Sequence, residues 1–566
     1  MATPEDQVNK RCHQTALTLT DVGKYSIAQL CVSLLCNINE TESDVAWSKT
    51  YVSKLVEDIG LPVQVSNSLC MMLEPENMQA EDEDQGSNLE PLSLTLRGEP
   101  SLSEDISLVI LELIRLSLKQ NGYDARARVL VFVVGRKLGV GEAQCDGYED
   151  DLAASMALVI ENNEKNDEEA NSRKWRRKKK KAFLIGLGVV TGGAIIGLTG
   201  GLAAPVVAAS AGALIGGSGA TFLASSAGLA LITSVFGATG AGLTGYKMNR
   251  RVGMTEEFEF VTLSPVRRLH VTICVSGWLL EDETDEFTTQ WAALSSSLES
   301  YSLKWESKFL LELGTAIRDL VASNVASVAT VEALKYTVLQ GLMAAVAWPA
   351  TLLNAASVID NPWSVCASRA KEVGRELAHV LLSRKQGRRP VTLIGFSLGA
   401  RVVYYCLEEL SALGDSGGIV QDAILLGAPV NGNAERWKKI SAIVAGIIVN
   451  GFCRNDWLLK FLYRTTAMRY CVAGLSEVTW KNRRMVNVDL TDIVHGHVDY
   501  ADPEKLGAIF DIIGVKTDSE VMQSFVPQQA SEDFTDARCL VREILDEQLD
   551  IAIAVSVSKE TIDCEP

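Results

Sequence analysis

Short apolar runs alternate with helix-like sequence in the carboxy-terminal half of the chain. Most of these runs are apolar almost throughout, which is typical of parallel strands covered on both faces. Six of them are predicted strands, at residues 271–279, 301–306, 391–395, 423–427, 447–452 and 485–490. Because helix-like segments separate most of them, the pattern predicts an α/β domain over residues 252–516, with a doubly wound and mostly parallel sheet.

The first part of the chain, residues 1–170, has helical patterning instead. Residues 106–116 are strongly apolar and residues 125–138 combine apolar positions with polar ones at one end, so we expect a helix at each place. Between residues 74 and 100 the sequence is acidic and rich in turn formers, which predicts a flexible loop. The acidic tail 517–566 is expected to hold one helix and a disordered end.

A long uncharged segment lies between these two parts. Residues 182–246 carry no charge and are rich in Gly, Ala, Leu, Ile and Val. A membrane helix needs about 20 apolar residues, so there is room for two crossings and a third is possible. With breaks at Pro205 and at the glycines of 216–219, we predict a transmembrane hairpin of residues 182–204 and 221–246. The alternative is a buried helical hairpin in a soluble protein.

Basic residues flank this segment on both sides. Eight of the nine residues 173–181 are Lys or Arg, and Lys247, Arg250 and Arg251 follow the segment. Positive charge at both ends favours leaving both in the cytosol, and hence an even number of crossings. Beside an apolar span, the basic run indicates contact with anionic lipid rather than a nuclear signal. The net charge of −18 argues against nucleic-acid binding.

The strongest chemical motif is the pentapeptide Gly395-Phe396-Ser397-Leu398-Gly399. It follows a β-prone run and precedes helix-compatible sequence, which is the context of a G-x-S-x-G nucleophile elbow. Glycines are needed on both sides because side chains there would collide with neighbouring backbone. The turn exposes the serine hydroxyl as a nucleophile and leaves the Leu398 amide free to bind an oxyanion.

A catalytic histidine and a catalytic acid should follow the serine, in the order Ser, Asp, His. Of the five histidines, only His495 and His497 come after it. We favour His497, because Gly496 eases backbone approach, and keep His495 as its substitute or as a supporting neighbour. The alternative is that both are surface-loop histidines.

Asp456 is the favoured acid because it follows the apolar run 447–452 and its turn. A carboxylate there would accept a hydrogen bond from the imidazole and hold its tautomer. The alternative role is to cap the next helix, 457–462, and the two roles are compatible. Asp422 and Asp489 are rivals, but they lie at the start of or inside predicted strands.

Ser276-Gly277-Trp278 ends the first predicted strand, where an α/β-hydrolase places its oxyanion loop. The amide of Trp278 or of Leu279 is therefore the expected second oxyanion donor. With Ser397, Asp456 and His497 each at a strand's carboxyl end, the fold expected for the sheet domain is an α/β-hydrolase.

Composition adds few constraints. At 566 residues the chain has room for two or three domains. Its start is polar and acidic rather than a secretory signal, and its twelve cysteines form no C-x-x-C pair, which favours reduced thiols in the cytosol. We expect no metal site and no cofactor.

One further apolar stretch bears on the substrate. Residues 336–359 are uncharged and lie between the second and third predicted strands, within an expected apolar helical cover at 310–385. A membrane crossing there would separate strands of one sheet, so we exclude it. The stretch is either a lipid-accepting lid beside the serine or an ordinary core helix.

Together, the basic run, the glycine-rich hairpin, the 275–279 segment, the serine elbow and Gly496-His497 resemble the transmembrane and coiled-coil domain-containing protein 4 family. The resemblance covers roughly residues 100–515. It implies a multi-pass membrane protein with an α/β-hydrolase-like domain, and it implies Ser397, Asp456 and His497 as triad positions. No sustained heptads support the coiled-coil part of the name.

These observations predict a serine hydrolase in an intracellular membrane, with its catalytic domain facing the cytosol. Membrane lipid is the expected partner, lipid or acyl esters are the expected substrates, and the amino-terminal helices are expected to bind proteins. The alternative is a non-catalytic membrane adaptor for trafficking or tethering that retains a hydrolase fold. Two or three crossings without an intramembrane charge offer no pathway for a transporter.

Overall fold

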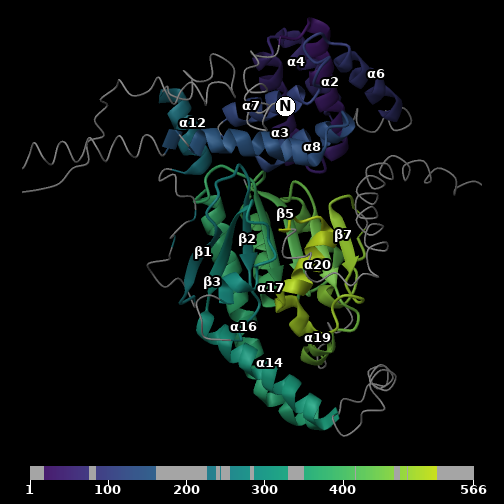
Figure 1. Ribbon diagram of the computed structural model, residues 1–566. Coiled ribbons are helices and arrows are strands. Elements are labelled where there is room, and N and C mark those ends of the chain that lie inside the picture. Colours follow the sequence, from purple (N-terminus) through teal and green to yellow (C-terminus); the bar gives the residue numbers. More distant parts are fainter. Residues whose placement is uncertain are drawn as a thin grey trace, which may run out of the picture.

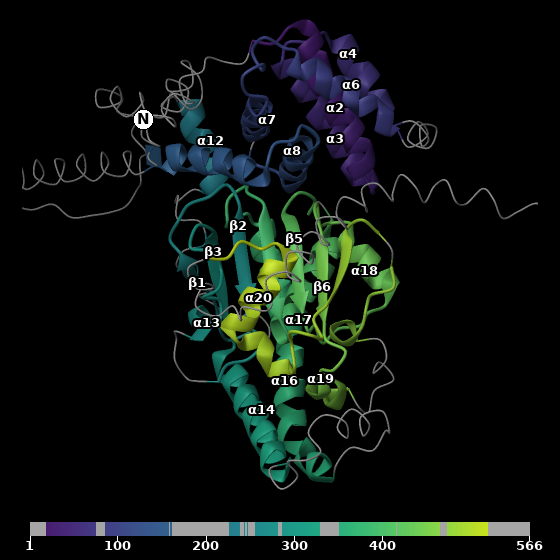
Figure 2. The same ribbon diagram turned by 45° about the vertical axis from the view of Figure 1, so that its right-hand side comes forward.

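The computed structural model describes residues 18–74, 85–120, 122–157, 159–160, 226–237, 243, 246, 255–280, 286–328, 350–414, 416–463, 472–480 and 482–518. The amino-terminal part is helical, and Figures 1 and 2 show its helices gathered at one end of the molecule. They are α2 (Asp21–Ile38), α3 (Glu42–Asp58), α4 (Val63–Met72), α6 (Gln85–Arg97), α7 (Leu108–Lys119) and α8 (Ala125–Lys137). Helices α7 and α8 confirm the two helices predicted there.

Helix α6 corrects the prediction of a flexible loop between residues 74 and 100. Leu89, Leu92 and Leu96 recur at helical spacing, Leu96 is buried, and α6 packs on α2. Burial of this apolar stripe outweighs the turn-forming residues and even Pro91 inside the helix. The prediction was therefore wrong for α6, and the acidic residues 81–84 lie outside the described residues.

The carboxy-terminal part is built on a seven-stranded sheet with the order β1-β3-β2-β4-β5-β6-β7. Its strands are β1 (Phe258–Ser264), β2 (Val271–Val275), β3 (Glu299–Trp305), β4 (Val391–Phe396), β5 (Val420–Leu426), β6 (Ile448–Phe452) and β7 (Met485–Asp489). Only β1 pairs antiparallel, with β3, and the other pairings are parallel. The predicted α/β class and all six predicted strands are confirmed, although the first is shorter than expected.

Strand β1 was missed by the sequence reading. Phe258 and Phe260 are buried and alternate with partly exposed residues, which is the period of a strand with one covered face. A search for continuous apolar runs does not find an edge strand of this kind.

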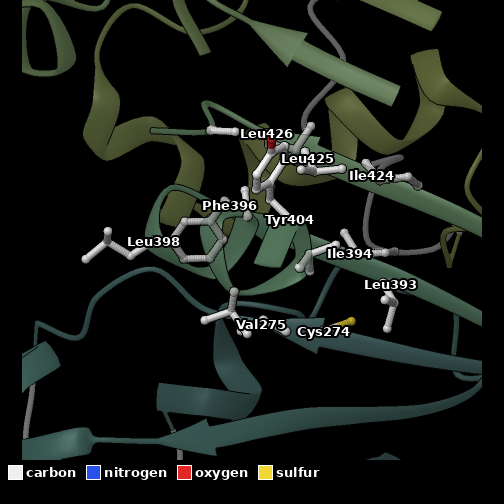
Figure 3. Close-up of a cluster of buried hydrophobic side chains, with 14 of the residues drawn as sticks. Cys274, Val275, Leu393, Ile394, Phe396, Leu398, Tyr404, Ile424, Leu425 and Leu426 are labelled. Atoms are coloured by element: carbon white, nitrogen blue, oxygen red, sulfur yellow. The ribbon is translucent and has the colours of Figure 1, made fainter. Parts of the chain in front are cut away.

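Helices pack around the sheet and give it one continuous core. Helix α17 (Leu398–Leu413) packs against β2, β4 and β5, and α16 (Ala350–Leu382) packs along α17. Figure 3 shows side chains of β2, β4 and β5 meeting those of α17 at the centre of this core. The other helical elements of this part are α13 (Glu286–Thr289), α14 (Ser307–Val328), α18 (Ala434–Ser441), α19 (Trp457–Leu462), η2 (Ala473–Leu475), η3 (His497–Ala501) and α20 (Pro503–Ile513).

The amino-terminal helices have a separate core and cover the edge where the parallel strands begin. The Tyr123 N–H donates to the Arg388 carbonyl (2.8 Å) and the Ala125 N–H to the Gly418 carbonyl (3.0 Å), just before β4 and β5. The Arg484 guanidinium donates to Asp44 of α3 at 2.8 Å. The opposite edge, where the strands end, is left to the loops that carry the candidate chemistry.

Helices α14 and α16 pack on each other and extend away from that second edge, opposite the amino-terminal helices (Figures 1 and 2). Helix α16 falls within the helical cover predicted at 310–385, and α14 begins three residues before it. Most of the apolar stretch 336–359 lies outside the described residues.

The predicted transmembrane hairpin is described only in part. Its first segment, 182–204, lies outside the described residues; within the second, 221–246, the structure has α12 (Ser226–Phe236). Gly237, with a φ of +86°, follows the last residue of this helix. That last residue, Phe236, is buried beneath the Arg389 guanidinium, which lies 4.8 Å from its ring centroid. Across the described ranges, every helix is too short or too polar to span a bilayer.

Candidate active site

Ser397 stands at a sharp turn between β4 and α17, as the elbow motif predicts. Its φ is +50°, a left-handed conformation that is unfavourable for a residue with a side chain, and its N–H donates to the Leu426 carbonyl at 2.8 Å. The flanking glycines are required by packing. A Cβ on Gly399 would lie 1.9 Å from the Val275 carbonyl oxygen, and one on Gly395 would lie 2.6 Å from Gly399.

Three side chains from three different loops meet at this turn. Ser397 Oγ lies 2.7 Å from His497 Nε2, and His497 Nδ1 lies 2.5 Å from Asp456 Oδ2. His497 begins η3 after β7, and Asp456 follows β6, so each comes from the carboxyl end of its strand. The structure thus brings together the serine, histidine and aspartate that the sequence singled out, in a geometry that allows proton transfer from Ser397 to His497.

Asp456 serves two partners at once. Its Oδ1 accepts the Leu459 N–H at 2.9 Å and caps α19, while Oδ2 faces His497. The rival acids lie elsewhere: Asp422 accepts the Ile447 N–H at 2.8 Å, and Asp489 pairs with Arg454. Asp456 therefore makes both contacts expected from the sequence, the helix cap and the hydrogen bond with the imidazole.

His495 is exposed and does not join this group. Its backbone N–H donates to Asp499 at 2.8 Å, two residues before His497 enters the buried site. His497, and not His495, is therefore the histidine that lies beside Ser397.

Two backbone amides near the elbow are candidates to bind an oxyanion. Leu398 is the first residue of α17, and its N–H has no intrahelical acceptor because no helical carbonyl lies four residues before it. Gly277 packs against the elbow, since a Cβ there would lie 2.7 Å from Ser397 Cβ and 3.1 Å from Leu398 N. Between the two alternatives for the second donor, the Leu279 N–H is engaged by the Leu310 carbonyl at 3.3 Å, which leaves Trp278.

Aromatic and neutral groups surround the imidazole. The ring centroids of Trp278 and Tyr500 lie 5.2 and 5.7 Å from that of His497. Burial, followed by the charge of Asp456, holds the pKa of Tyr500 well above its usual value, and burial raises the pKa of Cys453 to about 11. Neither group adds a charge beside Asp456 near neutral pH. No three His, Cys, Asp or Glu side chains within the described ranges are grouped to hold a metal ion.

Three residues that hold the oxyanion loop were not found from the sequence. The indoles of Trp291 and Trp305 donate to the Ser276 hydroxyl and carbonyl oxygens, both at 3.1 Å. The Gln290 amide donates to the Trp278 carbonyl at 3.2 Å. The stretch 290–305 carries no motif, so only the fold shows that it fixes this loop.

The chain is similar to one protein family and to several named proteins. A family model described as "Protein of unknown function (DUF726)" matches residues 176–516. An uncharacterized membrane protein of Caenorhabditis elegans is 38% identical over 515 residues, which cover 89% of this chain and 82% of the relative. The transmembrane and coiled-coil domain-containing protein STS1 of Oryza sativa is 40% identical over 434 residues, or 74% of this chain and 64% of the relative.

A more distant relative carries a functional name. The probable lipase MIL1 of Saccharomyces cerevisiae is 29% identical over 485 residues, which cover 84% of this chain and 43% of the relative. No solved structure matches the chain. The rice relative bears the name of the family suggested by the motifs, so that resemblance is confirmed. Since the family model matches more than half of its residues, the chain belongs to the DUF726 family.

Proposed function

We propose that the protein is a membrane-anchored serine hydrolase with an α/β-hydrolase fold that cleaves carboxylic esters of lipids. The observation that carries the proposal is the hydrogen-bonded series from Ser397 Oγ through His497 to Asp456, with distances of 2.7 and 2.5 Å. A serine at a strained elbow, a histidine within reach and a buried carboxylate behind it are the parts that acyl transfer needs.

The proposed reaction begins when Ser397 Oγ attacks the ester carbonyl carbon while His497 Nε2 takes the hydroxyl proton. Asp456 stabilises the resulting imidazolium, and the Leu398 and Trp278 amides bind the oxyanion. As the tetrahedral intermediate collapses, His497 returns the proton to the departing alcohol and Ser397 keeps the acyl group. Water then attacks the acyl-enzyme with His497 again as base, and the carboxylic acid leaves.

A lipid substrate is supported by the name of the yeast relative, a probable lipase, and by the membrane-protein names of other relatives. The basic run 173–181 beside the uncharged residues 182–225 supports anchoring in a membrane with anionic lipid, whereas residues 226–236 form α12, which packs on the protein. We place the hydrolase domain on the cytosolic side of an intracellular membrane, because the basic run favours the cytosol. Protein partners would meet the amino-terminal helices.

A non-catalytic adaptor is the second candidate, and one observation favours it. Ser397 and Asp456 have no exposed surface and His497 is 1% exposed, so a substrate cannot reach them in this conformation. A non-catalytic adaptor that retains a hydrolase fold would keep these three side chains but would not need to expose them to a substrate.

Labelling by a fluorophosphonate probe in membranes separates the two candidates. We expect the wild-type chain to be labelled and to hydrolyse an acylglycerol, and we expect Ser397→Ala to lose both. Ser411→Ala is the matched control, because this serine lies on the same helix, α17, and its hydroxyl donates to the Lys439 carbonyl away from the site. Unchanged labelling in Ser397→Ala would remove the proposed nucleophile. If labelling is lost in Ser397→Ala but the wild-type chain does not hydrolyse the acylglycerol, Ser397 is an activated serine whose substrate is a different one.

A further inference from the structure

The nucleophile is closed off in this structure. Ser397, Leu398, Asp456 and Trp278 have no exposed surface, although all except Asp456 are groups that a substrate would have to touch. An ester can reach Ser397 only if a covering side chain moves. Identifying that side chain shows how access to the site is controlled.

The side chain of Trp278 lies near Ser397, between the oxyanion loop and His497. Trp278 follows β2, whereas His497 follows β7, which lies four strands away in the sheet order. Its ring is nevertheless 5.2 Å from the His497 ring and 5.1 Å from that of Phe396, the residue before Ser397. Figure 3 labels Phe396 and Leu398, which precede and follow Ser397 at this turn. The indole therefore extends from the oxyanion side of the elbow to the imidazole, beside the nucleophile.

The N–H group of the Trp278 indole lacks a hydrogen bond to any described residue in this position. Its Nε1–H is buried and has no hydrogen-bond partner among the described residues, whereas the indoles of Trp291 and Trp305 both donate to Ser276. A buried donor without an acceptor is unfavourable, so the closed position gains no hydrogen bond from this group. Movement of the ring toward water or a substrate oxygen would supply the missing acceptor.

Helix α14 holds the loop that carries this ring. The Leu279 N–H donates to the Leu310 carbonyl, the Arg318 guanidinium donates to the Leu280 carbonyl, and Gly314 lies directly against Leu279. Positions 310, 314 and 318 are spaced by four, so one face of α14 follows the loop for two turns. A Cβ on Gly314 would lie 1.7 Å from the Leu279 oxygen, which shows how closely the two are packed.

We propose that the Trp278 indole is a movable cover over Ser397, held closed by the contact between α14 and residues 278–280. Because α14 extends away from the sheet (Figures 1 and 2), a force on that helix is transmitted to the loop. Release of the contact lets the indole swing out, uncovers Ser397 and keeps the Trp278 amide for the oxyanion. This proposal rests on the proposed function, since it takes Ser397 to be an activated nucleophile.

The test is the rate of fluorophosphonate labelling of the full-length chain in membranes. We expect Trp278→Ala to be labelled faster than wild type, because it removes the cover and retains the backbone amide. If the open form is populated at about 0.1–10%, the gain is between about tenfold and a thousandfold. Trp437→Ala is the matched control: Trp437 is equally large and buried, but its ring packs against Tyr404 and its indole donates to the Asn431 carbonyl, so no acceleration is expected.

Arg318→Ala is a second variant that keeps the test decisive if Trp278→Ala does not fold. Arg318 is exposed, so its loss should not unfold the chain, and it should speed labelling by loosening α14 from Leu280. Labelling of the folded variants no faster than that of wild type would overturn the cover while leaving the hydrolase proposal intact. If wild type and both folded variants fail to react, the activated serine itself is excluded and both proposals fall.

Discussion

Asp456 and His497 meet at 2.5 Å, from Oδ2 to Nδ1, and the other carboxylate oxygen of Asp456 caps α19. The cap fixes the orientation of the carboxylate, because rotation about its side chain would break the bond to the Leu459 N–H. Both side chains are enclosed by the protein, where such a bond is stronger than in water. A helix cap thus positions the acid that orients the base.

The first prediction concerns Asp456→Asn. The amide oxygen can still cap α19, so we expect the melting temperature to change little. The amide nitrogen, if turned toward His497, would favour the tautomer that cannot accept the serine proton. Ester turnover should fall by up to about 10⁴-fold, as measured by initial rates on the purified chain.

Asp489→Asn is the control for that variant. Asp489 also lies at the carboxyl end of a strand, but it pairs with the exposed Arg454. Its turnover should match that of wild type. Equal losses in the two variants would show that a general change in the loops, rather than the bond to His497, limits the reaction.

The second prediction uses the two neighbouring histidines. His497→Ala removes the group 2.7 Å from Ser397 Oγ and should abolish fluorophosphonate labelling. His495→Ala changes an exposed side chain whose backbone alone makes the bond to Asp499, and labelling should persist. The reverse pattern would assign the base to His495 and contradict the geometry.

The sequence identified the three side chains that meet at the elbow, because each is tied to a local pattern. The elbow needs glycines around Ser397, and only two histidines follow it, so chain order alone left few candidates. Asp456 was found because an apolar strand and a turn precede it. The place of each group at the end of a parallel strand then implied that they would converge.

Other features depended on contacts that local patterns do not contain. The alternation of Phe258 and Phe260 identifies β1 only if an edge strand is sought. The Trp278 ring meets His497 across the sheet, a relation fixed by strand order rather than by spacing. The uncharged sequence of α12 suggests a membrane span, but its last residue, Phe236, is buried in the protein against Arg389.

The third prediction concerns the buried pair of Arg389 and Glu299, which are 1% and 3% exposed. Arg389 donates to both Glu299 oxygens, at 2.5 and 3.0 Å, and its guanidinium lies over Phe236 of α12. Arg389→Met would leave the Glu299 carboxylate buried without its cation. We expect a loss of about 3–5 kcal/mol in the free energy of unfolding, measured by urea denaturation.

Arg454→Ala provides the comparison for this pair. Arg454 is 53% exposed and bonds Glu477 and Asp489 at the surface. Exposed ion pairs contribute about 0–1 kcal/mol, so this variant should remain close to wild type. A similar small effect for Arg389→Met would mean that Glu299 is adequately solvated by its other donors, the Arg268 N–H and the Tyr301 hydroxyl.

The last prediction is a pH dependence of stability that arises at His270. Its Nε2 lies 2.9 Å from Thr392 Oγ1. Burial, and then the cations Arg128, Arg389 and Lys516, hold the pKa of His270 well below its usual value near 6.5. Below that usual value the unfolded chain binds a proton that the folded chain does not. Stability is therefore lost as the pH falls below about 6.5, by at most about 1.4 kcal/mol per pH unit.

His270→Gln tests this effect, because glutamine can still hydrogen-bond Thr392 but does not titrate. Between pH 7 and pH 5 the wild-type melting temperature should fall further than that of His270→Gln, so the curves converge or cross as the solution is acidified. His379→Gln removes an exposed histidine and should follow the wild-type curve. Parallel curves for wild type and His270→Gln would show that His270 takes up its proton equally well in the folded chain, in spite of the three cations around it.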